Sequence, residues 1–187
     1  DVPYRRLAAA VEEAYAAGHF GERIMCREFA SDVVIYRGAG SYVCGEASGL
    51  LSSLEGKRGY PRNRPPRLTV KGLFQMPTVV NNVETLANVT AILALGAEAF
   101  KKVGTPKSPG TQLVSISGHI ARPGVYEVEH GYPLNKFLFE DCGGMMAGAK
   151  LKCIIPGGIS TKVLTAAEIE PVTYDHASFN AAGSSLG

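Results

Sequence analysis

The feature that most constrains the fold is a glycine-rich turn between a run of β-branched residues and a stretch of small residues. Residues 32–36 read Asp-Val-Val-Ile-Tyr, a continuous apolar run typical of a strand buried on both faces. Residues 38–45 hold three glycines, and residues 46–54 have the pattern of a short helix. A strand, a glycine turn and a helix in this order form a βα unit, which places ligands at the carboxyl end of the strand. The sequence therefore predicts an α/β domain with a ligand site at this turn.

Two further helices and a long loop complete this first half. Residues 4–17 have apolar residues at helical spacing, which predicts an amphipathic helix ending at Gly18. Residues 56–77 are rich in Gly, Pro and basic residues, so we expect a long functional loop there. Five of its basic residues fall within eleven positions, and the loop holds no acid: Lys57, Arg58, Arg62, Arg64 and Arg67. Asn82 is a good N-cap for an apolar helix that runs to Gly96.

Residues 104–110 contain two prolines and two glycines, which predicts a linker between two domains. After it the pattern is strand, strand, helix, strand, strand, typical of a small β-sheet around one helix, the β-grasp arrangement. The five expected elements are residues 113–118, 124–128, 133–141, 151–155 and 162–164. The fold class is therefore α/β, or α+β for the whole chain. The predicted domains are a partial nucleotide-binding domain at 1–103, the linker at 104–110, a β-grasp domain at 111–170 and a tail at 171–187.

Charge and composition exclude several classes of function. The chain has 187 residues and a formal net charge of +2 at pH 7, too little for a general nucleic-acid-binding field. A membrane-spanning helix needs about 20 apolar residues, and the longest apolar stretch, residues 89–100, is shorter and carries a glutamate. We therefore expect no nucleic-acid partner and no membrane insertion.

Metal and hydrolase chemistry also lack support. No pair of cysteines has the CxxC spacing of zinc or iron–sulfur sites, and no histidines have helical ligand spacing; we expect reduced structural thiols and no metal site. The cysteines are Cys26, Cys44, Cys142 and Cys153. Ser48, Ser52 and Ser53 lie outside any G-x-S-x-G elbow, which disfavours hydrolysis.

The residues around the glycine turn have both a structural and a functional interpretation. Gly38-x-Gly40 lacks the third glycine of a dinucleotide fingerprint, so alone it fits an ordinary tight turn. Together with a buried strand and the basic loop it indicates a site for a nucleotide or flavin phosphate. Glu46 is either a helix-terminal acid or a ligand carboxylate. Asn81, Asn82 and Thr85 are either a cap and first turn, or ligand contacts.

Four long motifs resemble one family in the right order: residues 37–46, 54–59, 77–88 and 115–127. They are similar to the NADH-binding, FMN-carrying subunit of respiratory complex I and its relatives in bidirectional hydrogenases and formate dehydrogenases. The resemblance implies the C-terminal part of a flavin-binding α/β domain followed by a β-grasp domain of the soluble-ligand-binding type. It also implies that the glycine-rich nucleotide loop lies upstream of residue 1 and that a 4Fe-4S domain lies downstream. We expect this chain to be the central part of a longer subunit.

The resemblance assigns FMN contacts to five residues: Gly45, Glu46, Asn81, Asn82 and Thr85. It implies that the intact subunit takes a hydride from NAD(P)H onto FMN and passes single electrons to iron–sulfur centres, ultimately to quinone or another acceptor. The implied partners are other subunits of a multi-subunit dehydrogenase, including an iron–sulfur protein. The implied location is cytoplasmic, peripheral to the inner face of the membrane.

Two positions depart from the family pattern, and both resemble nicotinamide-nucleotide contacts. Ala47 stands where the family has a second glutamate, and Arg67 stands where it has an aromatic residue. A neutral site with a nearby arginine admits a 2′-phosphate, so we expect the protein to prefer or tolerate NADPH. The alternative is that this chain has lost its nicotinamide-nucleotide site and takes electrons elsewhere.

A second function class remains open on the sequence alone. The polypeptide is then a non-catalytic scaffold whose β-grasp domain docks an iron–sulfur partner, because no catalytic residue is visible in residues 111–164. The discriminating feature is the missing upstream glycine loop. The absence of an initiator Met favours a fragment of the enzyme over a complete scaffold.

Overall fold

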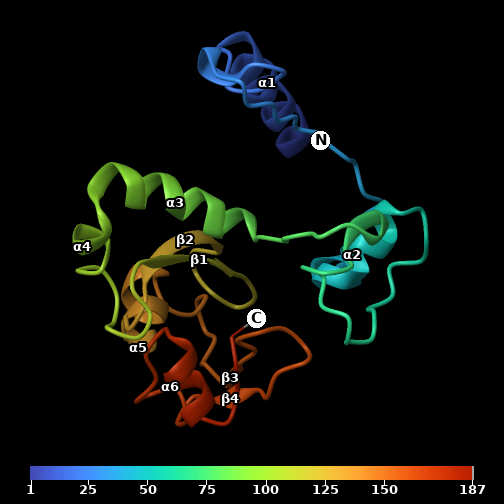
Figure 1. Ribbon diagram of the computed structural model, residues 1–187. Helices are drawn as coiled ribbons and strands as arrows, with labels where there is room; N and C mark the ends of the chain where they lie inside the picture. Colours follow the sequence, from blue (N-terminus) through green and yellow to red (C-terminus); the bar gives the residue numbers. More distant parts are fainter. Residues whose placement is uncertain (187) are drawn as a thin grey trace. The chain divides into compact units, whose positions relative to one another are not determined.

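The computed structural model describes residues 1–186, which divide after Asn81 into two compact units (Figure 1). The first unit holds α1 (Val2–Ala16), α2 (Ala47–Leu54) and three short 3-10 turns at Ile24–Cys26, Tyr42–Gly45 and Leu73–Gln75. The second unit begins with α3 (Val83–Leu95) and α4 (Ala97–Phe100). It continues with β1 (Thr111–Ile116), β2 (Gly124–Glu129), α5 (Leu134–Lys136), β3 (Cys153–Ile154), β4 (Leu164–Thr165) and α6 (His176–Ala181).

Helix α1 confirms the predicted amphipathic helix. Pro3 lies in its first turn, where the missing N–H costs no hydrogen bond. The Tyr15 hydroxyl donates to Asp32 Oδ1 at 3.0 Å and accepts the Val33 N–H at 3.0 Å. This tyrosine therefore ties the helix to the segment that precedes the glycine turn.

The predicted strand at residues 32–36 is wrong in this structure. The segment has no strand assignment, and the side chains of Val34 and Tyr36 are 87% and 59% exposed. A strand exists only when a neighbour accepts and donates its backbone hydrogen bonds. Within the described residues no segment forms such a ladder with residues 32–36. The apolar run therefore stays unpaired.

Helix α2 begins directly after the glycine turn, as predicted. Its buried face combines an apolar side chain with two serine hydroxyls. Glu46 is its N-cap, and Leu51 is 2% exposed. Ser48 and Ser52, one turn apart, are 1% and 6% exposed. This buried pair of hydroxyls faces the long loop, which is irregular as the sequence predicts.

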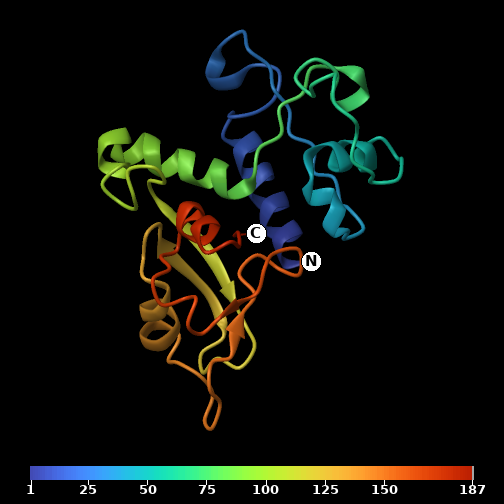
Figure 2. The ribbon, with the colours of Figure 1, turned by 90° about the horizontal axis from the view of Figure 1, so that it is seen from below.

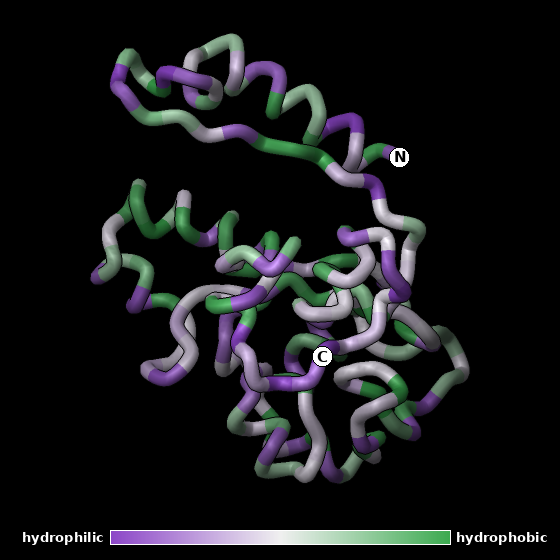
Figure 3. The backbone as a smooth tube through the Cα atoms, turned by 45° about the vertical axis from the view of Figure 1, so that its right-hand side comes forward, coloured by the Kyte–Doolittle hydropathy of each residue, from purple (hydrophilic) through white to green (hydrophobic). Residues whose placement is uncertain are grey.

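Helix α3 starts at the predicted cap, because Asn82 Oδ1 accepts the Glu84 N–H at 2.7 Å. Apolar residues recur through the helix, as the hydropathy colouring of the backbone shows (Figure 3). Glu84 Oε1 in turn accepts the backbone N–H of Leu113 at 2.7 Å. The N-terminal turn of α3 is therefore fastened to strand β1.

The second half has the predicted order of two strands, a helix and two strands. β1 and β2 form an antiparallel hairpin from the pair Thr111 and Glu129 to the pair Ile116 and Gly124 (Figure 2). The helical stretch is α5, which continues as a π-helical turn at Phe137–Asp141. β3 and β4 pair separately, so the expected single sheet consists of two two-stranded sheets.

The core of the second unit lies between these hairpins and the helix. Phe137 and Leu164 are 2% and 0% exposed. Residues of the predicted tail complete this core, since Val172, Tyr174 and Phe179 are 3%, 7% and 1% exposed. The predicted linker, residues 104–110, lies inside the second unit, with a bridge between Gly104 and Pro109. The predicted domain bounds stay a prediction.

Candidate functional site

The best-defined polar cluster surrounds Glu46 at the start of α2. Glu46 Oε2 accepts the Ser48 hydroxyl at 2.5 Å and the Gly49 N–H at 2.8 Å. Its other oxygen, Oε1, lies 3.5 Å from Arg64 Nη2. These hydrogen bonds, that from Ser48 above all, lower the pKa of Glu46. The carboxylate is thus ionised and oriented, and Oε1 remains open to a further donor.

Ser48 and Arg62 connect this carboxylate to the basic loop. The Ser48 hydroxyl accepts the backbone N–H of Arg62 at 2.8 Å. The Arg62 guanidinium donates from Nε to Ser52 Oγ at 3.0 Å and from Nη1 to Gly72 O at 3.1 Å. Arg62 therefore holds both arms of the loop against α2.

Glu55 is the counter-charge of this network. Its side chain is 5% exposed, and its Oε1 lies 3.0 Å from Arg62 Nη2, an ion pair without the alignment of a hydrogen bond. Glu55 Oε1 also accepts the backbone N–H of Phe74 at 2.9 Å. The hydrogen bond from Lys57 is the largest of the effects that lower the pKa of Glu55 to about 2. Glu55 is therefore a fixed anionic anchor for the loop.

This geometry corrects the prediction of a basic patch without counter-charge. Lys57 and Arg62 pair with Glu55, and Arg64 pairs with Glu46. Within the part of the chain that the structure describes, Arg58 and Arg67 form no ion pair. The counter-charges are Glu46 and Glu55, which lie at the two ends of α2. A search for acids inside the loop alone does not find them.

The other predicted residues of the first unit are accessible. Gly45 ends the Tyr42–Gly45 turn, and a Cβ added there would meet no atom within 4 Å. Packing within the chain therefore does not demand glycine at this position. Ala47 is half-buried at the first turn of α2, while Arg67 and Asn81 are exposed.

Asn82 and Thr85 stand at the N-terminus of α3, and both are exposed. The cap occupies Asn82 Oδ1, so only the two N–H groups of Asn82 Nδ2 are available to a ligand. In the described residues the Thr85 hydroxyl makes no hydrogen bond to the protein. With the unpaired N–H groups of the first helical turn, these donors suit an anionic or carbonyl oxygen.

The predicted site residues fall in both compact units. The structure brings Gly45, Glu46 and Ala47 together at the start of α2, and Asn82 and Thr85 together at the start of α3. Their assembly into one cofactor site stays a prediction. Sequence reasoning missed Ser48, Ser52 and Glu55. The signal that could have found them was the spacing of two serines one turn apart on a helix with small residues.

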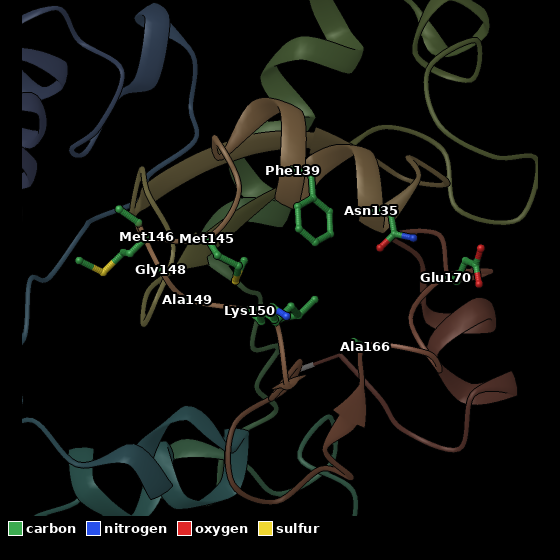
Figure 4. Close-up of a pocket in the computed structure, with 11 residues that line it drawn as sticks. Asn135, Phe139, Met145, Met146, Gly148, Ala149, Lys150, Ala166 and Glu170 are labelled. Atoms are coloured by element: carbon green, nitrogen blue, oxygen red, sulfur yellow. The ribbon is translucent and has the colours of Figure 1, made fainter.

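Two cavities in the second unit are lined by none of the predicted site residues. One cavity of about 690 Å³ is lined by Phe139, Met145, Lys150 and Glu170 among others (Figure 4). A second of about 760 Å³ lies between the segments around β1 and β3. Among residues 1–186 no three His, Cys, Asp or Glu side chains form a group able to hold a metal ion.

Comparison with protein-family models gives a match for each half of the chain. Residues 3–91 match the Nuo51 FMN-binding domain. The first half of the chain is therefore similar to the Nuo51 FMN-binding family. Residues 112–179 match the SLBB domain, so the second half carries the expected soluble-ligand-binding β-grasp domain. The resemblance inferred from the four motifs is confirmed.

Curated relatives give the same assignment. The chain is 49% identical over 183 residues to an NADH-quinone oxidoreductase subunit of Mycobacterium tuberculosis, covering 98% of this chain and 41% of that protein. The corresponding protein of Streptomyces coelicolor is also 49% identical, with 98% of this chain and 40% of that protein covered. The chain thus spans about two-fifths of the length of these relatives.

Solved structures support the fold as well. The NAD+-reducing NiFe hydrogenase in its H2-reduced state matches with a TM-score of 0.75 and 39% identity, over 87% of this chain and 26% of that chain. Its air-oxidised state matches with a TM-score of 0.67 and 42% identity, over 73% and 24% of the two chains. No helix in the described residues is long and apolar enough to cross a membrane.

Proposed function

We propose that this chain is part of a flavoprotein oxidoreductase that binds FMN and takes its electrons from a nicotinamide nucleotide. The family match, the relatives named as NADH-quinone oxidoreductase subunits and the NAD+-reducing hydrogenase support this function. When bound, FMN would supply an acceptor for a hydride and a donor of single electrons. The task of this chain is to bind and orient the cofactor.

The observation that carries the proposal is that the predicted contact residues have polar groups that can still form hydrogen bonds with a ligand. Glu46 Oε1 accepts only a long bond from Arg64 Nη2 at 3.5 Å, so it has capacity for a further donor, while Oε2 accepts two internal hydrogen bonds. Asn82 Nδ2 and the Thr85 hydroxyl remain open for acceptors. Gly45 offers bare backbone with open space above its Cα. The set contains an acceptor for flavin N–H groups and donors for carbonyl or phosphate oxygens, so these residues fit FMN.

The nucleotide preference follows from the two departures at Ala47 and Arg67. Ala47 cannot repel a 2′-phosphate as a carboxylate would, and Arg67 is exposed and forms no ion pair in the described chain. We therefore propose that the intact protein prefers, or at least tolerates, NADPH. Measurement of kcat/KM for both nucleotides with the intact protein tests this. A strong NADH preference would refute it, and Ala47→Glu is expected to move the ratio toward NADH.

The partners and location follow from the relatives, which are named as subunits. We propose assembly with other subunits of a dehydrogenase, including an iron–sulfur protein that receives the electrons. The location proposed is peripheral, on the cytoplasmic face of a membrane complex. Co-purification of the tagged intact protein with its partners, followed by iron analysis of the complex, tests the proposed assembly.

The first experiment is an FMN titration of the chain, followed by quenching of flavin fluorescence, with riboflavin as the control for the phosphate. We expect a Kd of about 10 μM or tighter, equivalent to about 7 kcal/mol, and weaker riboflavin binding. Glu46→Gln and Thr85→Val should each weaken binding while leaving the circular dichroism spectrum unchanged. Absence of binding by folded protein would mean that these residues do not suffice for a flavin site, whereas wild-type affinity in both variants would contradict the proposed contacts.

A further inference from the structure

The hydroxyl group of Ser48 lies next to the carboxylate of Glu46 and is sealed from water. Ser48 is 1% exposed, on the buried face of α2. Its hydroxyl donates to Glu46 Oε2 at 2.5 Å, and its oxygen accepts the backbone N–H of Arg62 at 2.8 Å. Since a serine hydroxyl has a single hydrogen, its one donor bond is committed to Glu46. Water cannot reach this buried position to replace the bond.

The carboxylate that Ser48 holds is itself partly open to solvent. The Glu46 side chain is 41% exposed, and a solvent-exposed side chain loses rotamer freedom when a ligand orders it, which weakens binding. Oε2 is held from within the chain, by the Ser48 hydroxyl at 2.5 Å and the Gly49 N–H at 2.8 Å. Oε1 accepts only the long bond from Arg64 Nη2 at 3.5 Å. The fold thus fixes one oxygen and leaves the other with capacity for a ligand.

We propose that Ser48 is a positioning residue for FMN: its buried hydroxyl holds the Glu46 carboxylate in the orientation that accepts a donor group of the cofactor. This inference rests on the proposed function and adds a residue that is too buried to contact the ligand itself. The support behind Ser48 is firm, because Arg62 is fixed in turn by Ser52 Oγ at 3.0 Å and Gly72 O at 3.1 Å. A binding group that is ordered before the ligand arrives costs less entropy on binding.

The test compares Ser48→Ala with Ser52→Ala, which is the matched control. Each variant removes a buried hydroxyl that binds Arg62, but only the Ser48 hydroxyl contacts Glu46. In fluorescence titration at pH 7, Ser48→Ala should raise the Kd for FMN about tenfold, which corresponds to one hydrogen bond to a charged group. Ser52→Ala should keep the wild-type Kd although it too loses thermal stability. Ser48→Thr retains the hydroxyl and should retain the affinity.

Two further measurements show whether the effect passes through Glu46. The double variant of Glu46→Gln with Ser48→Ala should bind FMN no more weakly than Glu46→Gln alone, because Ser48 acts only through this carboxylate. NMR titration of the ligand-free chain should place the pKa of Glu46 below its ordinary 4.5 in the wild type. In Ser48→Ala this pKa should rise toward 4.5, because the largest of the effects that lower it is gone. Ser52→Ala should leave the pKa of Glu46 unchanged.

Three outcomes would overturn the proposal while leaving the flavin function intact. Wild-type FMN affinity in Ser48→Ala would show that the hydroxyl does not position the carboxylate. An equal loss of affinity in Ser48→Ala and Ser52→Ala would show that both hydroxyls only support the fold. Additive losses in the double variant would show that Ser48 acts by a route other than Glu46. If the wild-type chain binds no FMN, the inference fails together with the proposed site.

Discussion

Replacing Asn82 by aspartate separates the two roles of this residue, because its two polar atoms have different tasks. Oδ1 caps helix α3 by accepting the Glu84 N–H at 2.7 Å, and aspartate caps a helix about as well as asparagine. Asn82→Asp should therefore keep the melting temperature. It removes both Nδ2 donors and places a negative charge where an FMN oxygen is proposed to lie. Loss of a hydrogen bond to a charged group costs about 1.5–3 kcal/mol, so the Kd for FMN should rise about tenfold or more.

Asn82→Ala completes the comparison, since it removes the cap as well. We expect it to destabilise the chain by about 1 kcal/mol and to weaken FMN binding too. Fluorescence titration gives the Kd, and urea unfolding followed by circular dichroism gives the stability. Asn88→Asp adds the same charge further along α3 and serves as the control. Wild-type FMN affinity in Asn82→Asp would refute the assignment of Nδ2 to the ligand.

Three further predictions concern stability. Gly49→Ala should destabilise the first unit, because the new Cβ would lie 2.9 Å from the backbone oxygen of Val43. Thermal unfolding measures the loss of stability. Unchanged stability would show that α2 and the turn around Val43 can move apart without cost. Glu55→Gln should destabilise the chain at pH 7. The pKa of Glu55, about 2 in the fold, lies below its ordinary 4.5, so its contribution is present above about pH 4.5 and is lost as the pH falls toward 2. The difference in stability between wild type and Glu55→Gln should shrink over that range, and a difference constant with pH would contradict the anchor. Phe179→Ala, at a side chain 1% exposed, should cost about 3–5 kcal/mol in urea unfolding, whereas a cost near zero would mean that the core closes without this ring.

Local signals in the sequence predict the parts of the fold that local interactions decide. The start of α3 is predictable because a cap and its first turn are neighbours in the chain. The order of the β-grasp elements follows from alternation and turns. The prediction of a strand at residues 32–36 is wrong for the converse reason. An apolar run indicates burial, whereas a strand also requires a neighbouring strand, which the local pattern does not identify.

The candidate site shows the same division. The positions of Glu46 and Asn82 at two helix starts are evident in the sequence, because acids and asparagines are favoured there. The link from Ser48 through Arg62 to Glu55 joins residues up to fourteen positions apart through side-chain atoms. Only the folded loop reveals that three of its basic side chains pair with carboxylates at the two ends of α2.

The bond between Glu84 Oε1 and the Leu113 N–H has a consequence for how this protein is dissected or recombined. The match to the FMN-binding domain ends at residue 91, inside α3, yet the first turn of this helix is anchored on β1 of the SLBB domain. A protein truncated after residue 103 would keep Asn82 and Thr85 but lose the strand that orients them. A chimera that exchanges the SLBB half must therefore preserve a free strand-edge N–H opposite Glu84 if the helix is to keep its orientation.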